Sequence, residues 1–219
     1  MTVPDEGIDN TVVGACVAQS HAGFEEIHFP GCAATIWKST PSHKIQNWVR
    51  LNPDDPLSAR LILAADTVRD AIHKTALICG TPACPECSML ADDIVALPMI
   101  LAQVMDASSL RLRLDVANGD AFCEFRIGAV TARLVCTYRD PGTQNGISTD
   151  GATSSRVFAV PACAPIILRG IQRLDGANSG LLHRETPIEG SGETRLLLVL
   201  DPVTVDAEDH QPEHITTIH

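Results

Sequence analysis

The sequence predicts an α+β fold in which a mainly helical N-terminal half precedes a β-rich, jelly-roll-like C-terminal domain. Apolar residues recur at helical spacing between residues 66 and 105. After Asp106 the period of the apolar pattern changes to two, which is the period of a strand. Turn motifs such as Asn118-Gly119 and Asp150-Gly151 then separate short apolar runs. Several short strands with turn-rich gaps are typical of a sandwich or jelly roll.

The N-terminal half begins with a segment of weak pattern, so residues 1–20 are expected to be flexible. Residues 21–106 are expected to form a mainly helical region packed on the barrel. An apolar run at 33–37 predicts a strand, and a helix should start around Ser42. Helical spacing predicts further helices over 66–77 and 88–105, and Pro98 should kink or interrupt the second.

The C-terminal half, residues 107–202, is expected to form the jelly roll. Strict alternation over 110–116 and 132–138 predicts two strands, with Arg111 and Arg113 on the polar face of the first. Shorter apolar runs at 156–160, 165–168 and 196–200 predict further strands, and Asn145-Gly146 is interpreted as a turn. Residues 203–219 are acidic, contain three histidines and are expected to form a flexible tail.

Charge and composition exclude several classes of partner. The chain has 219 residues, a formal net charge of -11 and a pI of about 5.0, and it has no basic patch to oppose that charge. A field of this sign repels nucleic acid. The first ten residues lack the basic region of a signal peptide, and no segment supplies the roughly 20 apolar residues of a membrane span. The expectation is a cytoplasmic protein without membrane or nucleic-acid partners, whose eight cysteines stay reduced.

Two C-terminal motifs and one N-terminal motif carry a resemblance. They are the segments 133–143 (RLVCTYRDPGT), 182–201 (LHRETPIEGSGETRLLLVLD) and 36–38 (IWK). Together they resemble the bacterial family named domain of unknown function 1826, over residues 33 to 201. Its members usually carry Phe-His-Val-Asp before the Arg-Leu-Cys-Thr-Tyr motif, then a distal His and a distal Arg. That order is similar to the double-stranded β-helix (cupin-like) oxygenases dependent on iron and 2-oxoglutarate.

The resemblance implies specific roles. In those oxygenases two His and one carboxylate bind Fe(II), and a distal Arg binds the far carboxylate of 2-oxoglutarate. His183 matches the distal His and Arg195 the distal Arg. Arg126 stands where the family has the first His, and Gly128 where it has the Asp. Because arginine stays protonated and cannot ligate a metal, this departure indicates a degenerate metal site.

A second candidate metal site is formed by Cys79, Cys84 and Cys87, a C-x-x-C pair with a third thiol five positions earlier. Three thiols in a turn-rich loop resemble part of a zinc knuckle, although a closed site needs a fourth ligand. Redox chemistry of the C-x-x-C pair and plain loop thiols are the alternatives. Cys123, Glu124 and Cys136 are also close enough in sequence to join His183 around zinc.

Three functional hypotheses follow. The first is a degenerate, oxygenase-like jelly-roll pocket that binds a small anion through Arg126 and Arg195, with Tyr138 beside them. The second is an active dioxygenase that uses iron and 2-oxoglutarate, with His183 as a ligand. The third is a zinc-binding protein that uses the Cys79, Cys84 and Cys87 loop. Neither the substrate nor the oligomeric state follows from the sequence.

Overall fold

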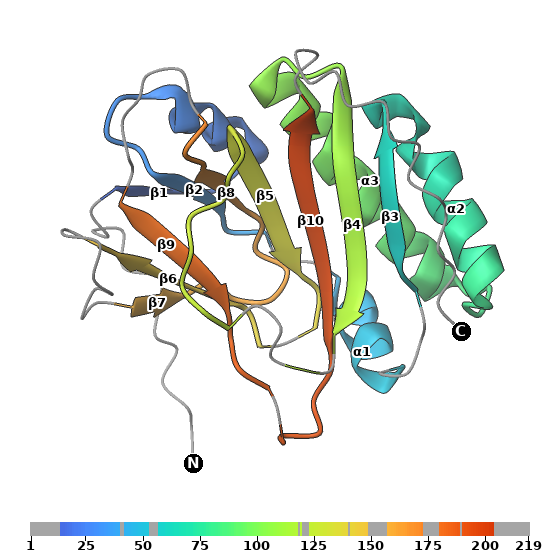
Figure 1. Ribbon diagram of the computed structural model, residues 1–219. Coiled ribbons are helices and arrows are strands. Elements are labelled where there is room, and N and C mark those ends of the chain that lie inside the picture. Colours follow the sequence, from blue (N-terminus) through green and yellow to red (C-terminus); the bar gives the residue numbers. More distant parts are fainter. Residues whose placement is uncertain are drawn as a thin grey trace.

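The structure is a computed structural model, and it describes residues 14–39, 42–52, 57–117, 119, 123–139, 141–148, 157–172, 180–188 and 190–203. In this part of the chain a seven-stranded sheet and a three-stranded sheet combine with helices in a mixed α+β fold. Figure 1 shows helices α2 and α3 along the half of the large sheet that ends at β3, and the small sheet beside the other half.

The large sheet has the strand order β1-β2-β8-β5-β10-β4-β3. Its neighbours pair antiparallel except β1 and β2, which are parallel. The strands are β1 (Ala15–Ala18), β2 (Ala34–Trp37), β3 (Ala59–Leu63), β4 (Ser109–Ala117), β5 (Ala132–Thr137), β8 (Ile166–Arg169) and β10 (Arg195–Val203). Segments far apart in the sequence therefore lie side by side, with β10 between β4 and β5.

The small sheet has the order β7-β6-β9 and is antiparallel throughout. Its strands are β6 (Thr143–Ile147), β7 (Val157–Ala159) and β9 (Leu181–Glu185). An isolated bridge between Arg126 and His183 extends this sheet by one residue pair beyond β9. The segment before β5 thus belongs with the small sheet.

The helices are η1 (His21–His28), α1 (His43–Leu51), η2 (Ala65–Thr67), α2 (Val68–Cys79) and α3 (Pro85–Met105). The longest, α3, starts where Cys84 accepts a bond from the Cys87 amide and Pro85 occupies the first turn. It ends at Asp106, which adopts the left-handed conformation. Pro98 does not interrupt this helix, and its side chain is buried.

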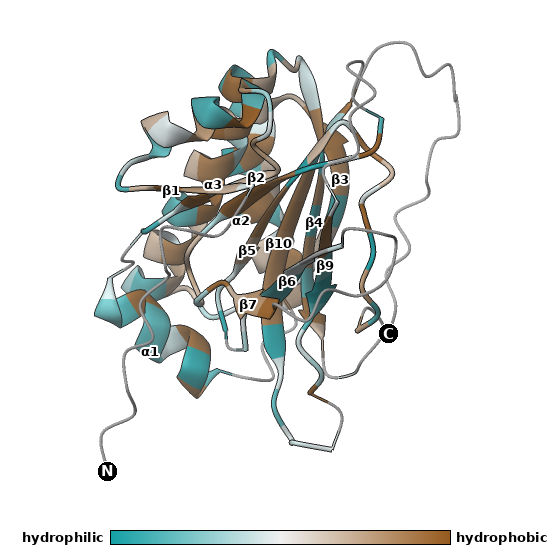
Figure 2. Cartoon of the chain, turned by 90° about the vertical axis from the view of Figure 1, so that its left-hand side faces the viewer, coloured by the Kyte–Doolittle hydropathy of each residue, from teal (hydrophilic) through white to brown (hydrophobic). Residues whose placement is uncertain are grey.

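Alternation along the strands places the main core on the helix side of the large sheet. Leu112 and Leu114 of β4, Leu134 of β5 and Leu198 of β10 are buried there together with Ile94 of α3. Figure 2 shows the central strands of this sheet coloured as hydrophobic. Each such leucine contributes roughly 1.5–3 kcal/mol through burial, so this layer holds helices and sheet together.

Most of the predicted elements are present, with differences at the margins. The helices at 66–77 and 88–105 and the strands at 110–116 and 132–138 are confirmed within a few residues. Residues 15–18, expected to be flexible, form β1, and the region 21–106 contains strands β2 and β3 as well as helices. Asn145-Gly146 lies inside β6, so the interpretation as a turn is wrong. The turn at 150–151 and the tail at 204–219 lie outside the described residues.

One helix corrects the expectation about apolar segments. Among the helices in the described part of the chain, α3 alone is long and apolar enough to cross a membrane by length and composition. Its buried side chains, however, pack in the main core with β4, β5 and β10. This is the environment of a core helix in a globular domain.

Candidate functional site

A group of polar side chains lies on the face of the large sheet that is turned away from the helices, beside a second, smaller aliphatic cluster. Leu197 and Val199 of β10 lie on this face, since they alternate with the core residues Leu196, Leu198 and Leu200. With the small sheet they enclose a cavity that has room for about one water molecule. Its lining consists of Arg113, Arg126, Arg133, Val135, Thr143, His183, Glu185, Leu197 and Val199.

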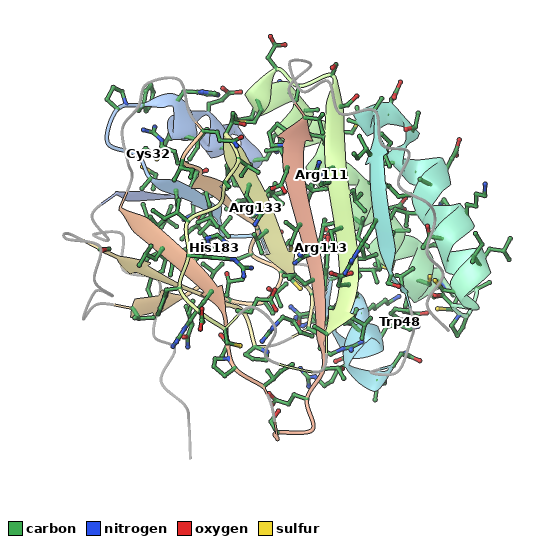
Figure 3. The ribbon with its side chains drawn as sticks, viewed as in Figure 1. Cys32, Trp48, Arg111, Arg113, Arg133 and His183 are labelled. Atoms are coloured by element: carbon green, nitrogen blue, oxygen red, sulfur yellow. The ribbon has the colours of Figure 1, made fainter. Side chains whose placement is uncertain are left out.

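Arginines from separate strands meet His183 in this cavity. Figure 3 shows Arg113 on β4, Arg133 on β5 and His183 on β9, and all three line the cavity. Arg111 lies on β4 before Arg113, is exposed and is not part of the lining. The strand alternation that predicted a polar face for β4 is correct, but at Arg113 this face points into the protein.

Arg126 and His183 are held together by their backbones. The Arg126 amide donates to the His183 carbonyl (3.0 Å), and the His183 amide donates to the Arg126 carbonyl (2.9 Å). A pair that exchanges both hydrogen bonds directs its two side chains to the same face of the sheet. The structure therefore brings together the two residues that the resemblance matched to the first His and the distal His.

His183 is a neutral imidazole at ordinary pH. It is 6% exposed. Burial, together with the charges of Arg133 and Arg126, lowers its pKa to about 3. A protonated imidazole would add a cation to a cavity that already contains guanidinium groups, so the fold keeps His183 uncharged.

Two of the cavity arginines form ion pairs with carboxylates. Arg133 donates Nε and Nη2 to Asp201 Oδ1 and Oδ2 at 2.7 and 2.8 Å, a two-point contact that raises the pKa of Arg133. Arg113 lies 2.9 Å from Asp115 and 3.7 Å from Glu185. These ion pairs link β5 to β10 and β4 to β9.

Arg195 is committed to a buried network at the edge of the cavity and is not part of its lining. Its guanidinium group is 0% exposed, and Nη1 lies 2.7 Å from Glu185 Oε2. Nε donates to the Pro141 carbonyl at 3.2 Å, and Nη2 donates to the Thr186 carbonyl. The expected anion-facing role is therefore not what the structure shows, because every nitrogen of this side chain has a protein partner.

Arg126 supplies the third guanidinium group of the cavity lining. Burial and the neighbouring Arg133 lower its pKa, while Glu185 acts in the opposite direction and Arg113 adds to the lowering. Three guanidinium groups and one carboxylate, Glu185, line the cavity. Two of these arginines pair with carboxylates outside the lining, Arg133 with Asp201 and Arg113 with Asp115, and Glu185 pairs with Arg195.

Asn145 is the residue that the sequence reasoning missed. It lies on β6 directly opposite His183 and shares its face of the strand with Thr143, which lines the cavity. Its side chain is 0% exposed, yet neither its amide nitrogen nor its amide oxygen has a hydrogen-bond partner in the described part of the protein. Because buried amides are almost always paired, this group is suited to a ligand or water. Reading Asn-Gly as a turn concealed it.

Tyr138 does not lie beside the arginines of the cavity, where the anion-binding hypothesis placed it. It lies on the helix side of the sheet, in the main core, where its hydroxyl donates to Asp93 Oδ2 of α3 at 2.7 Å. Cys136, on β5, is buried in the same core. Neither residue lines the cavity, so Tyr138 is not an anion-binding residue of this site and Cys136 cannot join His183 around zinc.

The residues of the cavity do not fit a divalent metal. Around His183 the charged neighbours are the guanidinium groups of Arg126 and Arg133, which repel a cation. Within the described ranges no three His, Cys, Asp or Glu side chains gather closely enough to hold a metal ion. Among the described residues, the cavity therefore lacks the donor set that an iron-dependent oxygenase requires.

The loop that contains Cys79, Cys84 and Cys87 does not form a metal site either. Cys79 contacts the Ser58 carbonyl at 3.9 Å, and Cys84 accepts the Cys87 amide at the start of α3. All three thiols are described, and they do not form a group of metal ligands. Cys84 serves as the N-terminal cap of α3, a structural role.

Comparisons with known proteins give distant structural similarities. The chain is similar to the dioxygenase for auxin oxidation 1 of Arabidopsis thaliana in complex with 2-oxoglutarate, with 9% identity, 80% of this chain and 70% of that chain covered, and a TM-score of 0.47. It is similar to the dioxygenase for auxin oxidation of rice, with 10% identity, coverage of 88% and 83%, and a TM-score of 0.48. A bsmA homologue from Methylobium petroleophilum PM1 gives 10% identity, coverage of 86% and 95%, and a TM-score of 0.47.

These similarities are too distant to carry an argument. No curated protein matches the chain. A family model, in contrast, matches residues 18–201, which include nearly all of the described fold and every residue of the cavity. The chain therefore belongs to the family described as protein of unknown function, DUF1826.

Proposed function

We propose that this protein is a double-stranded β-helix (jelly-roll) protein that binds a small carboxylate anion in the cavity between its sheets, without a metal. One observation carries the proposal: the guanidinium groups of Arg113, Arg126 and Arg133 line the same cavity as a neutral His183. An oxygenase with a similar order of motifs would hold iron at this place, whereas this chain has arginine side chains there.

Strand order supports the jelly-roll architecture. Strands β4, β5, β8 and β10 are neighbours in the large sheet, while β6, β7 and β9 form the small sheet. After β5 the chain passes to β6 and β7 in the small sheet, returns to β8, passes to β9 and returns to β10. Repeated passage between two sheets is characteristic of a jelly roll. A cavity between the two sheets is where such folds hold small ligands.

The chemistry of the lining favours a carboxylate. Guanidinium groups bind carboxylates through two parallel hydrogen bonds, as Arg133 already does with Asp201. The neutral imidazole of His183 and the unpaired amide of Asn145 add groups that both donate and accept. A ligand with a carboxylate and a nearby carbonyl or hydroxyl would satisfy all of them.

The size of the cavity limits the ligand. With room for about one water molecule, it admits a carboxylate only when the guanidinium groups of Arg113 and Arg126 move outward to bind it. A small mono- or dicarboxylate suits this space, whereas a nucleotide or a lipid does not.

The test is calorimetric titration of 2-oxoglutarate, as a representative dicarboxylate, into the protein in the presence of EDTA. Arg126→Gln should weaken binding by about tenfold or more, because it removes a charged bidentate donor. Arg111→Gln is the matched control, since it removes an exposed arginine from the same face of β4 without touching the cavity. Equal affinity in both variants would locate the ligand elsewhere.

The oxygenase alternative has its own discriminating variant. Arg126→His with Gly128→Asp introduces the two ligands that the family motif has at these positions. Gly128 has negative φ, and an added Cβ would meet only Val130 Cγ2 at 3.2 Å, so a side chain fits after a small shift. If the strand alignment is right, this double variant gains stoichiometric Fe(II) that the wild type lacks, as measured by elemental analysis.

A further inference from the structure

Two thiols outside the cavity lie in contact at the edge of the large sheet. Cys16 is on β1, Cys32 precedes β2, and their Sγ atoms are 3.5 Å apart. Both are free cysteines; Cys16 is half-buried and Cys32 is 5% exposed. A disulfide bond requires about 2 Å between the sulfurs, so this contact needs only a small approach to become covalent.

The fold, and not chance proximity, sets this contact. Strands β1 and β2 pair parallel with Ala15 opposite Ala34 and Cys16 opposite Thr35, and the Gly14 carbonyl accepts from the amides of Ala33 and Ala34. The chain between the two cysteines forms η1, which covers the sheet edge with Phe24 and Ile27 in the core.

The same segment is fixed from the other side. The buried guanidinium group of Arg169, at the end of β8, donates Nη2 to the carbonyls of Ile27 and Phe29 at 2.7 and 2.9 Å. This holds the residues just before Cys32 in place. Hydrogen bonds therefore hold the backbone next to both Cys16 and Cys32.

We propose that Cys16 and Cys32 form a reversible redox clasp that closes as a disulfide under oxidising conditions and fastens β1 and η1 to the large sheet. The oxidant is a small disulfide such as oxidised glutathione. The Cys16 sulfur, the more accessible of the two, attacks it and expels one glutathione thiol. The Cys32 sulfur then attacks Cys16 Sγ and expels the second. Two protein thiols are oxidised to one disulfide, and one glutathione disulfide is reduced to two glutathione thiols, which receive the two protons.

The environment of the two thiols should make formation of the disulfide slow. Burial and hydrogen bonding with Cys32 and Glu26 raise the pKa of Cys16 to about 12. Burial also raises the pKa of Cys32, although its contact with Cys16 and the charge of Arg169 act in the opposite direction. Because the thiolate is the attacking species, such thiols resist brief oxidation and respond to sustained oxidation.

The experiment maps disulfides in the oxidised full-length protein. The chain has no Lys or Arg before Lys38, so trypsin leaves both cysteines in one peptide, while additional cleavage after Glu25 and Glu26 separates them. After incubation with oxidised glutathione and alkylation of free thiols, the Cys16 and Cys32 peptides should be linked and should separate on reduction. A link between Cys84 and Cys87 with Cys16 and Cys32 still alkylated would overturn the proposal.

A stability measurement supplies an independent arm. The disulfide closes a loop that spans 16 positions, which should raise the Tm of the oxidised wild type by about 10 °C over the reduced form. Cys16→Ser should abolish this shift, whereas Cys84→Ser/Cys87→Ser should retain it. A shift that persists in Cys16→Ser would contradict the clasp, and peptide mapping of the wild type decides the matter should that variant fail to fold.

Discussion

The two faces of the large sheet differ in kind although the same strands build both. On the helix side, Leu112, Leu134 and Leu198 form a continuous aliphatic layer. On the side of the small sheet, Arg113 and Arg133 stand on the same strands, one residue along. The helix side is aliphatic, whereas the other side combines a second aliphatic cluster, which includes Val135, Leu197 and Val199, with buried charged side chains.

The face with the charged side chains is the one on which we expect a ligand-binding function. Buried ion pairs contribute little net stability compared with apolar residues of the same size, because desolvation offsets their attraction. A charged inner face is thus a poor choice for stability alone. Its presence here, together with the unpaired side chain of Asn145, fits a site made for a ligand.

The largest expected effect comes from breaking the buried pair of the charged face. Arg195→Ala should lower the free energy of unfolding by about 3–5 kcal/mol, because it leaves Glu185 as a buried carboxylate without its main partner. Leu198→Ala, on the helix side of the same strand, should cost about 2–5 kcal/mol through a cavity. Urea denaturation measures both.

A double variant separates charge from shape at this pair. Arg195→Met with Glu185→Leu removes both charges, so it should recover a large part of the loss seen in Arg195→Ala. A single Arg195→Ala variant as stable as the wild type would show that the charged face is not organised by this pair.

The next effect depends on pH and belongs to His183. Its pKa in the folded protein is about 3, below the ordinary value of 6.5, so the unfolded chain takes up a proton near pH 6.5 while the folded protein does not. Stability should therefore fall as the pH drops from about 6.5 toward 3, by about 2 kcal/mol at pH 5.

Replacing the imidazole isolates this contribution. In His183→Gln, the difference in unfolding free energy between about pH 7 and about pH 5 should shrink by about 2 kcal/mol. His73→Gln, on the exposed side of α2, serves as the control that loses a histidine outside the cavity. The same acid dependence in both variants would argue against a neutral, buried His183.

The smallest effect has the opposite sign. Asn145→Leu should raise the free energy of unfolding of the ligand-free protein by about 1 kcal/mol, because it removes two buried polar atoms that have no partner in the described structure. The same variant should weaken binding of 2-oxoglutarate. A loss of stability together with unchanged binding would show that Asn145 is a structural residue.

How far the sequence predicts this molecule differs between the two sheets. The large sheet and its helices could be predicted because buried leucines recur with period two or at helical spacing, as in β4 and α3. The strands β6 and β9 could not, because Gln144, Asn145 and His183 lack an apolar pattern. Edge strand β1 was missed because four residues of mixed exposure carry too little signal.

The site shows the same division. The family resemblance predicted that Arg126 and His183 belong to the same pocket, but it did not predict that their backbones pair. The burial of Arg195 against Glu185 was not predicted either, because nothing in the sequence says whether a charged strand residue faces solvent or a second sheet. Tyr138 was misplaced for a related reason: it lies one residue beyond β5, and the sequence does not show that its side chain enters the core on the helix side.

The measurement that tests the central claim most directly compares 2-oxoglutarate binding with EDTA and with Fe(II) under anaerobic conditions. We expect the same affinity in both, because guanidinium groups and not a metal hold the anion. In His183→Ala, too, we expect the affinity to be the same with EDTA and with Fe(II). Binding that appears only with Fe(II) and disappears in His183→Ala would contradict the account and restore the oxygenase function.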